Sequence, residues 1–129
     1  MTEPSHSKVV LGVDDSPEDL GLLNLILMGA GYSFVASEPA ECFNLVLRCA
    51  PRLILLDIQM PQLDGFEACR RLRSMPEARN IPIAFLTARK TRDDVKRGME
   101  VGGNDFIIKP FVRDKLLARV QHWTSRRVG

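Results

Sequence analysis

Three carboxylates, one hydroxyl group and one ammonium group follow the short apolar segments of this 129-residue chain. They belong to Asp14, Asp15, Asp57, Thr87 and Lys109. Magnesium ions prefer oxygen ligands, typically one or two carboxylates together with water and phosphate oxygens. A hydroxyl and an ammonium group suit a tetrahedral anion, because phosphoryl transfer requires mainly positioning and neutralisation of oxygen charge. A carboxylate can also attack phosphorus and form an aspartyl phosphate. These five side chains could therefore bind a divalent cation and a phosphoryl group if the fold brings them together.

The segment at residues 53–57 indicates how Asp57 is positioned. Four apolar residues run straight into Asp57, and the turn residues Pro61 and Gly65 follow. A short, continuously apolar run bounded by turn residues is typical of a strand that is buried on both faces. Comparable segments predict four more strands, at residues 8–13, 32–36, 83–86 and 105–109. Asp57 is thus expected at the carboxyl end of a buried strand.

A helical segment follows each predicted strand. The first helix begins well, because Ser16 can cap it, Pro17 suits the first helical position and Asp19 occupies the place of a capping-box acid. The later helices are expected from residue 39, from residue 64, over 91–101 and over 112–127.

Two of these helices carry specific expectations. The core face of the second helix is predicted to be formed by Phe43, Val46 and Leu47. The fourth helix is predicted to be weak, because its apolar face is little more than Val95 and Met99. It also contains Gly98, and an interior glycine costs about 1 kcal/mol relative to alanine.

The alternation of strand and helix, five times over, predicts the fold class. It implies an α/β domain with a five-stranded parallel sheet, doubly wound with helices on both faces. In such a sheet the carboxyl ends of all strands lie at one edge, where ligands bind. A single aspartate there often only caps a helix. Five polar groups at one edge favour a functional site.

Composition sets further limits. The chain is 45% hydrophobic and 26% charged, with a net charge of +2, as expected for one soluble globular domain. Neither nucleic-acid nor membrane binding is expected, since the charge is nearly balanced and no apolar run approaches about 20 residues. Residues 1–7 are expected to be a loose tail before a domain at 8–129. The unpaired cysteines Cys42, Cys49 and Cys69 are interpreted as buried structural thiols, which favours a cytoplasmic location.

The motifs taken together resemble the receiver domain of bacterial two-component response regulators, including the chemotaxis regulators. The resemblance covers residues 8–125. It rests on Asp14-Asp15, on LILLDIQMPQLDGFE around Asp57, on LTA at 86–88 and on GGNDFIIKPF at 102–111. It implies a flavodoxin-like strand order, 2-1-3-4-5, which periodicity alone could not give.

The resemblance also implies roles for the candidate residues. Asp57 would accept a phosphoryl group from a phosphohistidine of a sensor histidine kinase or histidine phosphotransfer protein. Thr87 and Lys109 would hold phosphoryl oxygens. Mg²⁺ would be bound, directly or through water, by Asp14, Asp15, Asp57 and the backbone carbonyl of Gln59.

Further implied features concern signalling. Ala88 would leave room for the phosphoryl group, and Gln59 and Arg89 would flank it. The Lys109–Pro110 peptide bond would be cis. Phosphorylation would draw Thr87 inward, and Phe106 would follow. The face formed by the fourth helix, fifth strand and fifth helix would then meet a downstream protein, an output domain or a second copy.

Two other functions stay open at this point. One is a pseudo-receiver that acts only as a phosphorylation-independent interaction module. The other is a small phosphohydrolase with an aspartate nucleophile, although such enzymes usually carry a DxD pattern and here Asp14 and Asp15 are adjacent. The favoured interpretation is a signalling domain that is not an enzyme beyond catalysing its own phosphoryl transfer and dephosphorylation. Trp123 could contact a partner or pack on the core. His6 and His122 lie outside the cluster of polar groups.

Overall fold

A computed structural model describes residues 9–125 of the chain. The strands are β1 (Val9–Val13), β2 (Ser33–Ser37), β3 (Leu53–Asp57), β4 (Ile83–Thr87) and β5 (Asp105–Ile108). The helices are α1 (Pro17–Gly29), α2 (Cys42–Cys49), α3 (Gly65–Arg73), α4 (Arg92–Glu100) and α5 (Arg113–Thr124), with a short 3-10 helix, η2 (Pro39–Glu41), before α2. Residues 1–7, expected to be a tail, lie outside the described residues.

All five strands are parallel and lie in the order β2-β1-β3-β4-β5, which confirms the predicted fold class and strand order. The register aligns the carboxyl ends of the strands. Val13 pairs with Leu56, Asp57 with Leu86, and Thr87 with Ile108. Residues that follow these strands therefore emerge side by side at one edge of the sheet.

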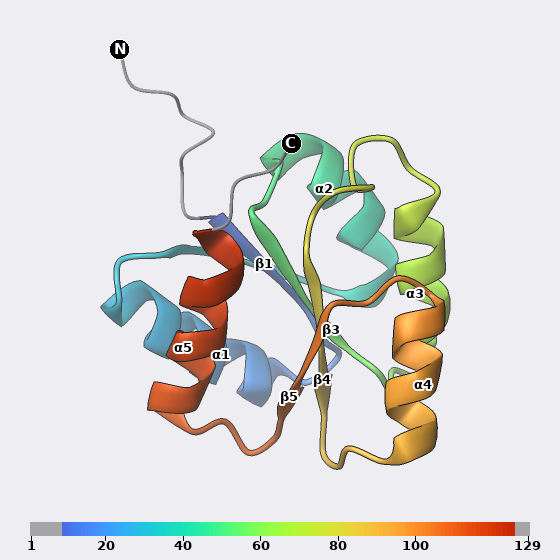
Figure 1. Cartoon of the computed structure of the whole chain (residues 1–129). Coiled ribbons are helices and arrows are strands. Elements are labelled where there is room, and N and C mark those ends of the chain that lie inside the picture. The colour runs from blue at the N-terminus through green and yellow to red at the C-terminus, as the bar shows by residue number, and fades with distance from the viewer. Residues whose placement is uncertain (1–8, 126–129) are drawn as a thin grey trace.

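The helices cover the sheet on both faces, and each face has its own apolar core. In Figure 1, α1 and α5 lie on one side of the sheet, and α2, α3 and α4 lie on the other. Leu27, Leu116 and Val120 pack in the first core, and Phe66 and Phe85 in the second. Every residue of β3 and β4 is buried, as expected for strands that are covered on both faces.

Side-chain caps fix where the helices near the site begin. The Ser16 hydroxyl accepts a hydrogen bond from the Asp19 amide, and Pro17 occupies the first turn of α1. Asp64 accepts from the Phe66 amide at the start of α3. Each cap satisfies an amide that has no partner within the helix.

Two core predictions were wrong. Leu47 of α2 is 51% exposed, and the buried residues of that helix are Cys42 and Val46. Met99 of α4 is 61% exposed, and the buried residue of α4 is Gly98. The reason in α4 is that aromatic rings press against the Gly98 backbone and leave no room there for a larger residue.

Cys42 and Cys69 are buried and Cys49 is half-buried, and all three thiols are free. Burial raises the pKa of Cys42 and of Cys69 to about 11, so both side chains stay protonated at neutral pH. Trp123 packs against the core from the last turn of α5, and its indole N–H donates to Asp105. Within residues 9–125, no helix is long and apolar enough to cross a membrane.

Candidate functional site

Asp57 is the last residue of β3, and the chain that follows folds tightly back over it. The Gly65 amide donates to the Ile58 carbonyl at 2.8 Å. A Cβ atom on Gly65 would lie 2.2 Å from the Asp57 carbonyl oxygen and 2.8 Å from the Ile58 Cα. Both contacts are with backbone, which cannot move aside. Glycine is therefore required at the start of α3 for the loop to hold Asp57 in place.

Three carboxylates meet beside this loop. Asp14, Asp15 and Asp57 each offer an oxygen atom, and these atoms lie within 4.8 Å of one another. Asp14 and Asp57 are buried, whereas Asp15 is exposed. The Ser16 amide donates to Asp14 Oδ1 at 3.0 Å and fixes the orientation of that carboxylate. Clustered carboxylate oxygens, one of them open to solvent, are the donor set that Mg²⁺ uses, so these residues fit the cation.

Lys109 supplies the positive charge of the site. Its ammonium group lies 2.8 Å from Asp19, 3.0 Å from Asp14 and 3.4 Å from Asp57. Partial burial alone would lower the pKa of Lys109, but the hydrogen bonds to Asp19 and Asp14 and the charges of Asp57 and Asp14 raise it overall. Lys109 is therefore cationic throughout the physiological pH range.

Asp19 is a member of the site that sequence reasoning missed. It was interpreted only as a capping acid, yet its carboxylate makes the shortest of the contacts with Lys109. Its position was the available signal: Asp19 lies in the first turn of α1, only four residues after Asp15. It therefore stays near the same edge of the sheet as the other acids.

Asp57 has a raised pKa, at about 6. Burial is the largest cause, because it penalises the charged carboxylate. The negative charge of Asp14 raises the pKa further, and the ammonium group of Lys109 opposes both effects. Repulsion between the Asp14 and Asp57 carboxylates thus contributes to the raised pKa of Asp57.

Thr87 lies at the end of β4, next to the cluster, but its hydroxyl group is engaged locally. The hydroxyl donates to the Arg89 carbonyl oxygen and accepts from the Arg89 amide. Ala88 and Arg89, which follow Thr87, and Gln59, two residues after Asp57, are exposed. The Lys109 amide donates to the Thr87 carbonyl oxygen at 2.7 Å, and the Lys109–Pro110 peptide bond is cis.

Phe106 points into the protein. It is only 7% exposed, and its ring centroid lies 5.2 Å from that of Phe85. A Cβ atom on Gly98 would lie 2.5 Å from the tip of the Phe106 ring. The inward position of Phe106 thus depends on Gly98 in α4. In this same structure the Thr87 hydroxyl is hydrogen-bonded to the Arg89 backbone.

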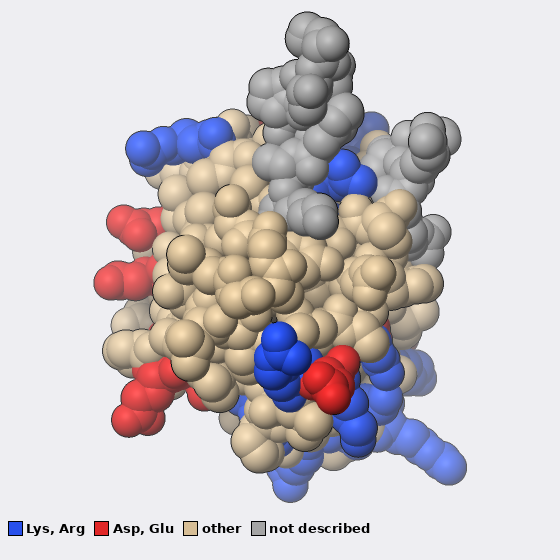
Figure 2. All heavy atoms as spheres, turned by 90° about the vertical axis from the view of Figure 1, so that its left-hand side faces the viewer, with Lys and Arg blue, Asp and Glu red and all other residues tan. Residues whose placement is uncertain are grey.

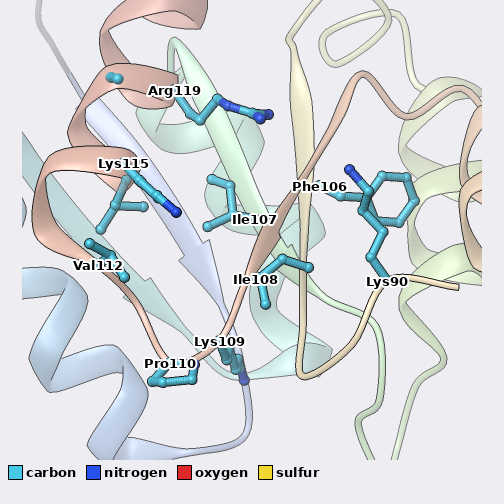
Figure 3. Close-up of a pocket in the computed structure, with 11 residues that line it drawn as sticks. Lys90, Phe106, Ile107, Ile108, Lys109, Pro110, Val112, Lys115 and Arg119 are labelled. Atoms are coloured by element: carbon cyan, nitrogen blue, oxygen red, sulfur yellow. The ribbon is translucent and has the colours of Figure 1, made fainter.

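Two surface depressions adjoin these residues. One, of about 410 Å³, lies beside the carboxylates and is lined by Asp15, Glu38 and Gln62 among others. The second, of about 670 Å³, lies between β5 and α5. Figure 3 shows Lys115 and Arg119 extending from α5 toward β5 over this second groove.

Comparison with known sequences places this geometry in context. The family model for the response regulator receiver domain matches residues 10–121. Response regulator MprA of Mycobacterium leprae is 38% identical over 113 residues, which make up 87% of this chain and 49% of MprA. Response regulator PleD of Caulobacter vibrioides is 37% identical over 116 residues, which make up 89% of this chain and 26% of PleD. The chain thus spans about half the length of MprA and about a quarter of PleD.

Solved structures share the fold of this chain. Chemotaxis protein CheY4 of Vibrio cholerae superposes with a TM-score of 0.87 at 27% identity, covering 91% of this chain and 98% of that one. The receiver domain of sensor histidine kinase PA1611 from Pseudomonas aeruginosa has a TM-score of 0.84 at 29% identity, covering 93% and 99%. That structure holds a magnesium ion in its active-site cleft. With the family model matched over nearly the whole domain, this chain belongs to the family of response regulator receiver domains.

Proposed function

We propose that this domain is a phosphorylation-controlled switch in which Asp57 is the phosphoacceptor. The observation that carries the proposal is the meeting of Asp14, Asp15, Asp57 and Lys109 at one edge of the sheet. The donor is a phosphohistidine on a sensor histidine kinase or histidine phosphotransfer protein.

In the proposed reaction, a carboxylate oxygen of Asp57 attacks the phosphorus atom of the phosphohistidine. The new O–P bond forms as the P–N bond breaks, and the imidazole leaves with the electron pair and takes up a proton. Lys109 neutralises charge on the phosphoryl oxygens. Asp14, Asp15, Asp57 and the carbonyl of Gln59 would hold Mg²⁺, which when bound offsets the negative charge of carboxylates and phosphate.

Residues at the mouth of the site hold and shield the phosphoryl group in this proposal. Thr87 reaches a phosphoryl oxygen after its hydroxyl leaves the Arg89 backbone. Ala88 leaves space for the group, and Gln59 and Arg89 lie on either side of it. Thr87 ends β4, Ala88 and Arg89 follow it directly, and Gln59 comes two residues after Asp57, which supports their assignment.

The proposed output is a change in the face formed by α4, β5 and α5, which then binds a downstream protein, an output domain or a second copy. The apolar floor of the groove between β5 and α5 includes Ile108 and Val112, which are 43% and 54% exposed. Figure 3 shows Val112 beside the basic side chain of Lys115, and Ile108 on β5 across the groove. Phe106 lines the same groove, so displacement of its ring would alter that surface.

The direct test is the intact mass after incubation with acetyl phosphate and Mg²⁺. The expected result is a gain of one phosphoryl group, which is lost in Asp57→Asn and in a sample with EDTA. Asp93→Asn, a change at an exposed acid of α4, serves as the matched control and gains the group normally. A wild-type protein that gains no mass would contradict the proposal and favour a phosphorylation-independent interaction module. Steady turnover of small phosphate esters would instead indicate a phosphohydrolase.

A further inference from the structure

The outer side of α1 is apolar, although it faces solvent. Leu22, Leu25 and Met28 are 39%, 72% and 59% exposed. No residue from 20 to 31 is charged. Figure 2, which views the molecule from the side that carries α1 and α5 in Figure 1, shows a broad area without lysine, arginine, aspartate or glutamate.

This apolar side is additional to the side that α1 buries. Leu23, Ile26 and Leu27 already pack against the sheet. A surface helix normally has one apolar stripe and a polar opposite face, and a helix that is apolar all round is normally buried. We call the exposed set the α1 face, which consists of Gly21, Leu22, Asn24, Leu25, Met28 and Gly29.

We propose that the α1 face is the contact between two copies of this chain, packed with α1 antiparallel to α1 about a two-fold axis. The first argument is electrostatic. A face without charge meets its own copy without repulsion, whereas most charged surfaces do not. Such a symmetric contact needs only one self-complementary patch.

The second argument is steric. Gly21, Leu25 and Met28 lie at intervals of four and three residues, on one side of the helix. A Cβ atom on Gly21 would meet nothing within 4 Å, so Gly21 is a shallow point of this side. Leu25 and Met28 project one and two turns further along. In an antiparallel pair, the projecting side chains of one copy lie over the glycine of the other, which lets the helices approach closely.

The third argument is area. The largest apolar patch on a typical monomer covers about 300–600 Å², and two patches of that size that meet would bury about 600–1,200 Å², near the lower limit for a specific interface. The dimer is therefore expected to be weak.

The position of the α1 face connects the dimer with the proposed phosphorylation. The consequence that follows rests on the proposed function, whereas the dimer itself does not. The α1 face begins two residues after Asp19, which binds Lys109. Two joined copies therefore cover the surface next to Asp57. A large protein donor would compete with the second copy, whereas a small donor such as acetyl phosphate would not.

The test is sedimentation velocity without any phosphodonor, over protein concentrations from about 10 µM to 1 mM. The wild type is expected to shift from monomer toward dimer, while Leu25→Glu stays monomeric over the range. Leu47→Glu is the matched control, because Leu47 is also an exposed helical leucine but lies on α2. It should dimerise like the wild type, and circular dichroism should show all three proteins folded.

A cysteine pair gives an independent measurement. Leu25→Cys should form a disulfide-linked dimer under mild oxidation, and Leu47→Cys should not. A wild-type protein that is monomeric at every concentration would overturn the inference, as would a dimer that survives Leu25→Glu. If that surviving dimer also accepts no phosphoryl group from a kinase, the α1 face would be the contact with the donor and not with a second copy. Because sedimentation needs no phosphorylation, failure here is distinguishable from failure of the proposed function.

Discussion

At the scale of single residues, Asp57 combines burial with a negative charge that the site needs. Its side chain is 9% exposed and lies beside the buried carboxylate of Asp14. In the folded protein the pKa of Asp57 is raised from 3.8 to about 6. The folded state therefore binds a proton more tightly than the unfolded state, and the charged form of Asp57 reduces stability.

Asp57→Asn is expected to stabilise the metal-free protein at neutral pH by up to about 3 kcal/mol, because the amide removes the buried charge. Below about pH 4 the carboxyl group is protonated in both states, so the advantage of the variant should vanish there. The wild type should thus lose stability relative to the variant as the pH rises from about 4 to about 6. Urea unfolding in EDTA at several pH values measures this difference. A difference in the free energy of unfolding that is constant across pH would contradict this explanation. Asp93→Asn controls for the general loss of one acid.

Asp19 holds Lys109 from the first turn of α1, so it should act as a positioning residue. Asp19→Asn removes the shortest of three ion pairs on Lys109, at 2.8 Å, and should slow phosphorylation of Asp57 several-fold. The initial rate of mass gain with acetyl phosphate measures this. Glu18→Gln, a change at the exposed neighbour, should leave the rate unchanged. Equal rates for the two variants would show that Asp19 has no part in positioning Lys109.

Arg89 is exposed and follows Thr87 by two residues, and in the proposed function its long side chain shields the phosphoryl group from water. Arg89→Ala is expected to shorten the lifetime of the phosphorylated protein, measured as loss of the added mass after the donor is removed. Lys90→Ala, one position further and also exposed, is the matched control. An unchanged rate of dephosphorylation in Arg89→Ala would remove this role.

At the scale of elements, α4 and β5 fit together through a glycine and two rings. Gly98 touches Phe106 and Phe85, and Arg97 lies over the Phe66 ring at 4.5 Å. Gly98 was interpreted as a weakness of α4 because glycine lowers helix propensity. The structure gives it a packing role: its missing side chain is the space that the Phe106 ring fills.

Gly98→Ala is therefore expected to destabilise the domain by about 1 kcal/mol, because overpacking of about 1–3 kcal/mol exceeds the helix-propensity gain of about 1 kcal/mol. In a Phe106→Leu background, where the ring tip is absent, the same change should stabilise. Urea unfolding of the four proteins in this cycle measures the coupling. Gly21→Ala, with open space around it, should stabilise dilute protein by about 0.5–1 kcal/mol. If Gly98→Ala stabilises as much as Gly21→Ala, the packing role is refuted.

Most elements could be predicted from the sequence, because strands and helices carry local patterns. The run at 53–57 became β3 with the same bounds, since apolar content and turn residues act within a few positions. Leu47 and Met99 were misplaced because helical spacing does not say which side of a short helix faces the sheet. The site role of Asp19 and the packing role of Gly98 were missed for a related reason. Asp19 contacts Lys109, about 90 positions away, and Gly98 contacts Phe106, about 8 positions away, and only the tertiary fold sets these contacts.

At the scale of the whole molecule, the parallel sheet explains why distant residues form one site. Alternating strands and helices predicted that the polar groups would share an edge, and the register of β1, β3, β4 and β5 provides that edge. The strand order itself could not be worked out from periodicity, since it depends on which strands pair over long range. It came from the family resemblance and is confirmed. The cytoplasmic location stays a prediction.

Asp105, the first residue of β5, links this strand to α5. Its carboxylate accepts a hydrogen bond from the Trp123 indole at 2.8 Å and forms an ion pair with Arg119. Trp123 is the only tryptophan in the sequence. The protein thus carries a built-in optical reporter at the border of its proposed output face. Its ultraviolet emission can follow movement of α5 against β5 in real time, with no label attached.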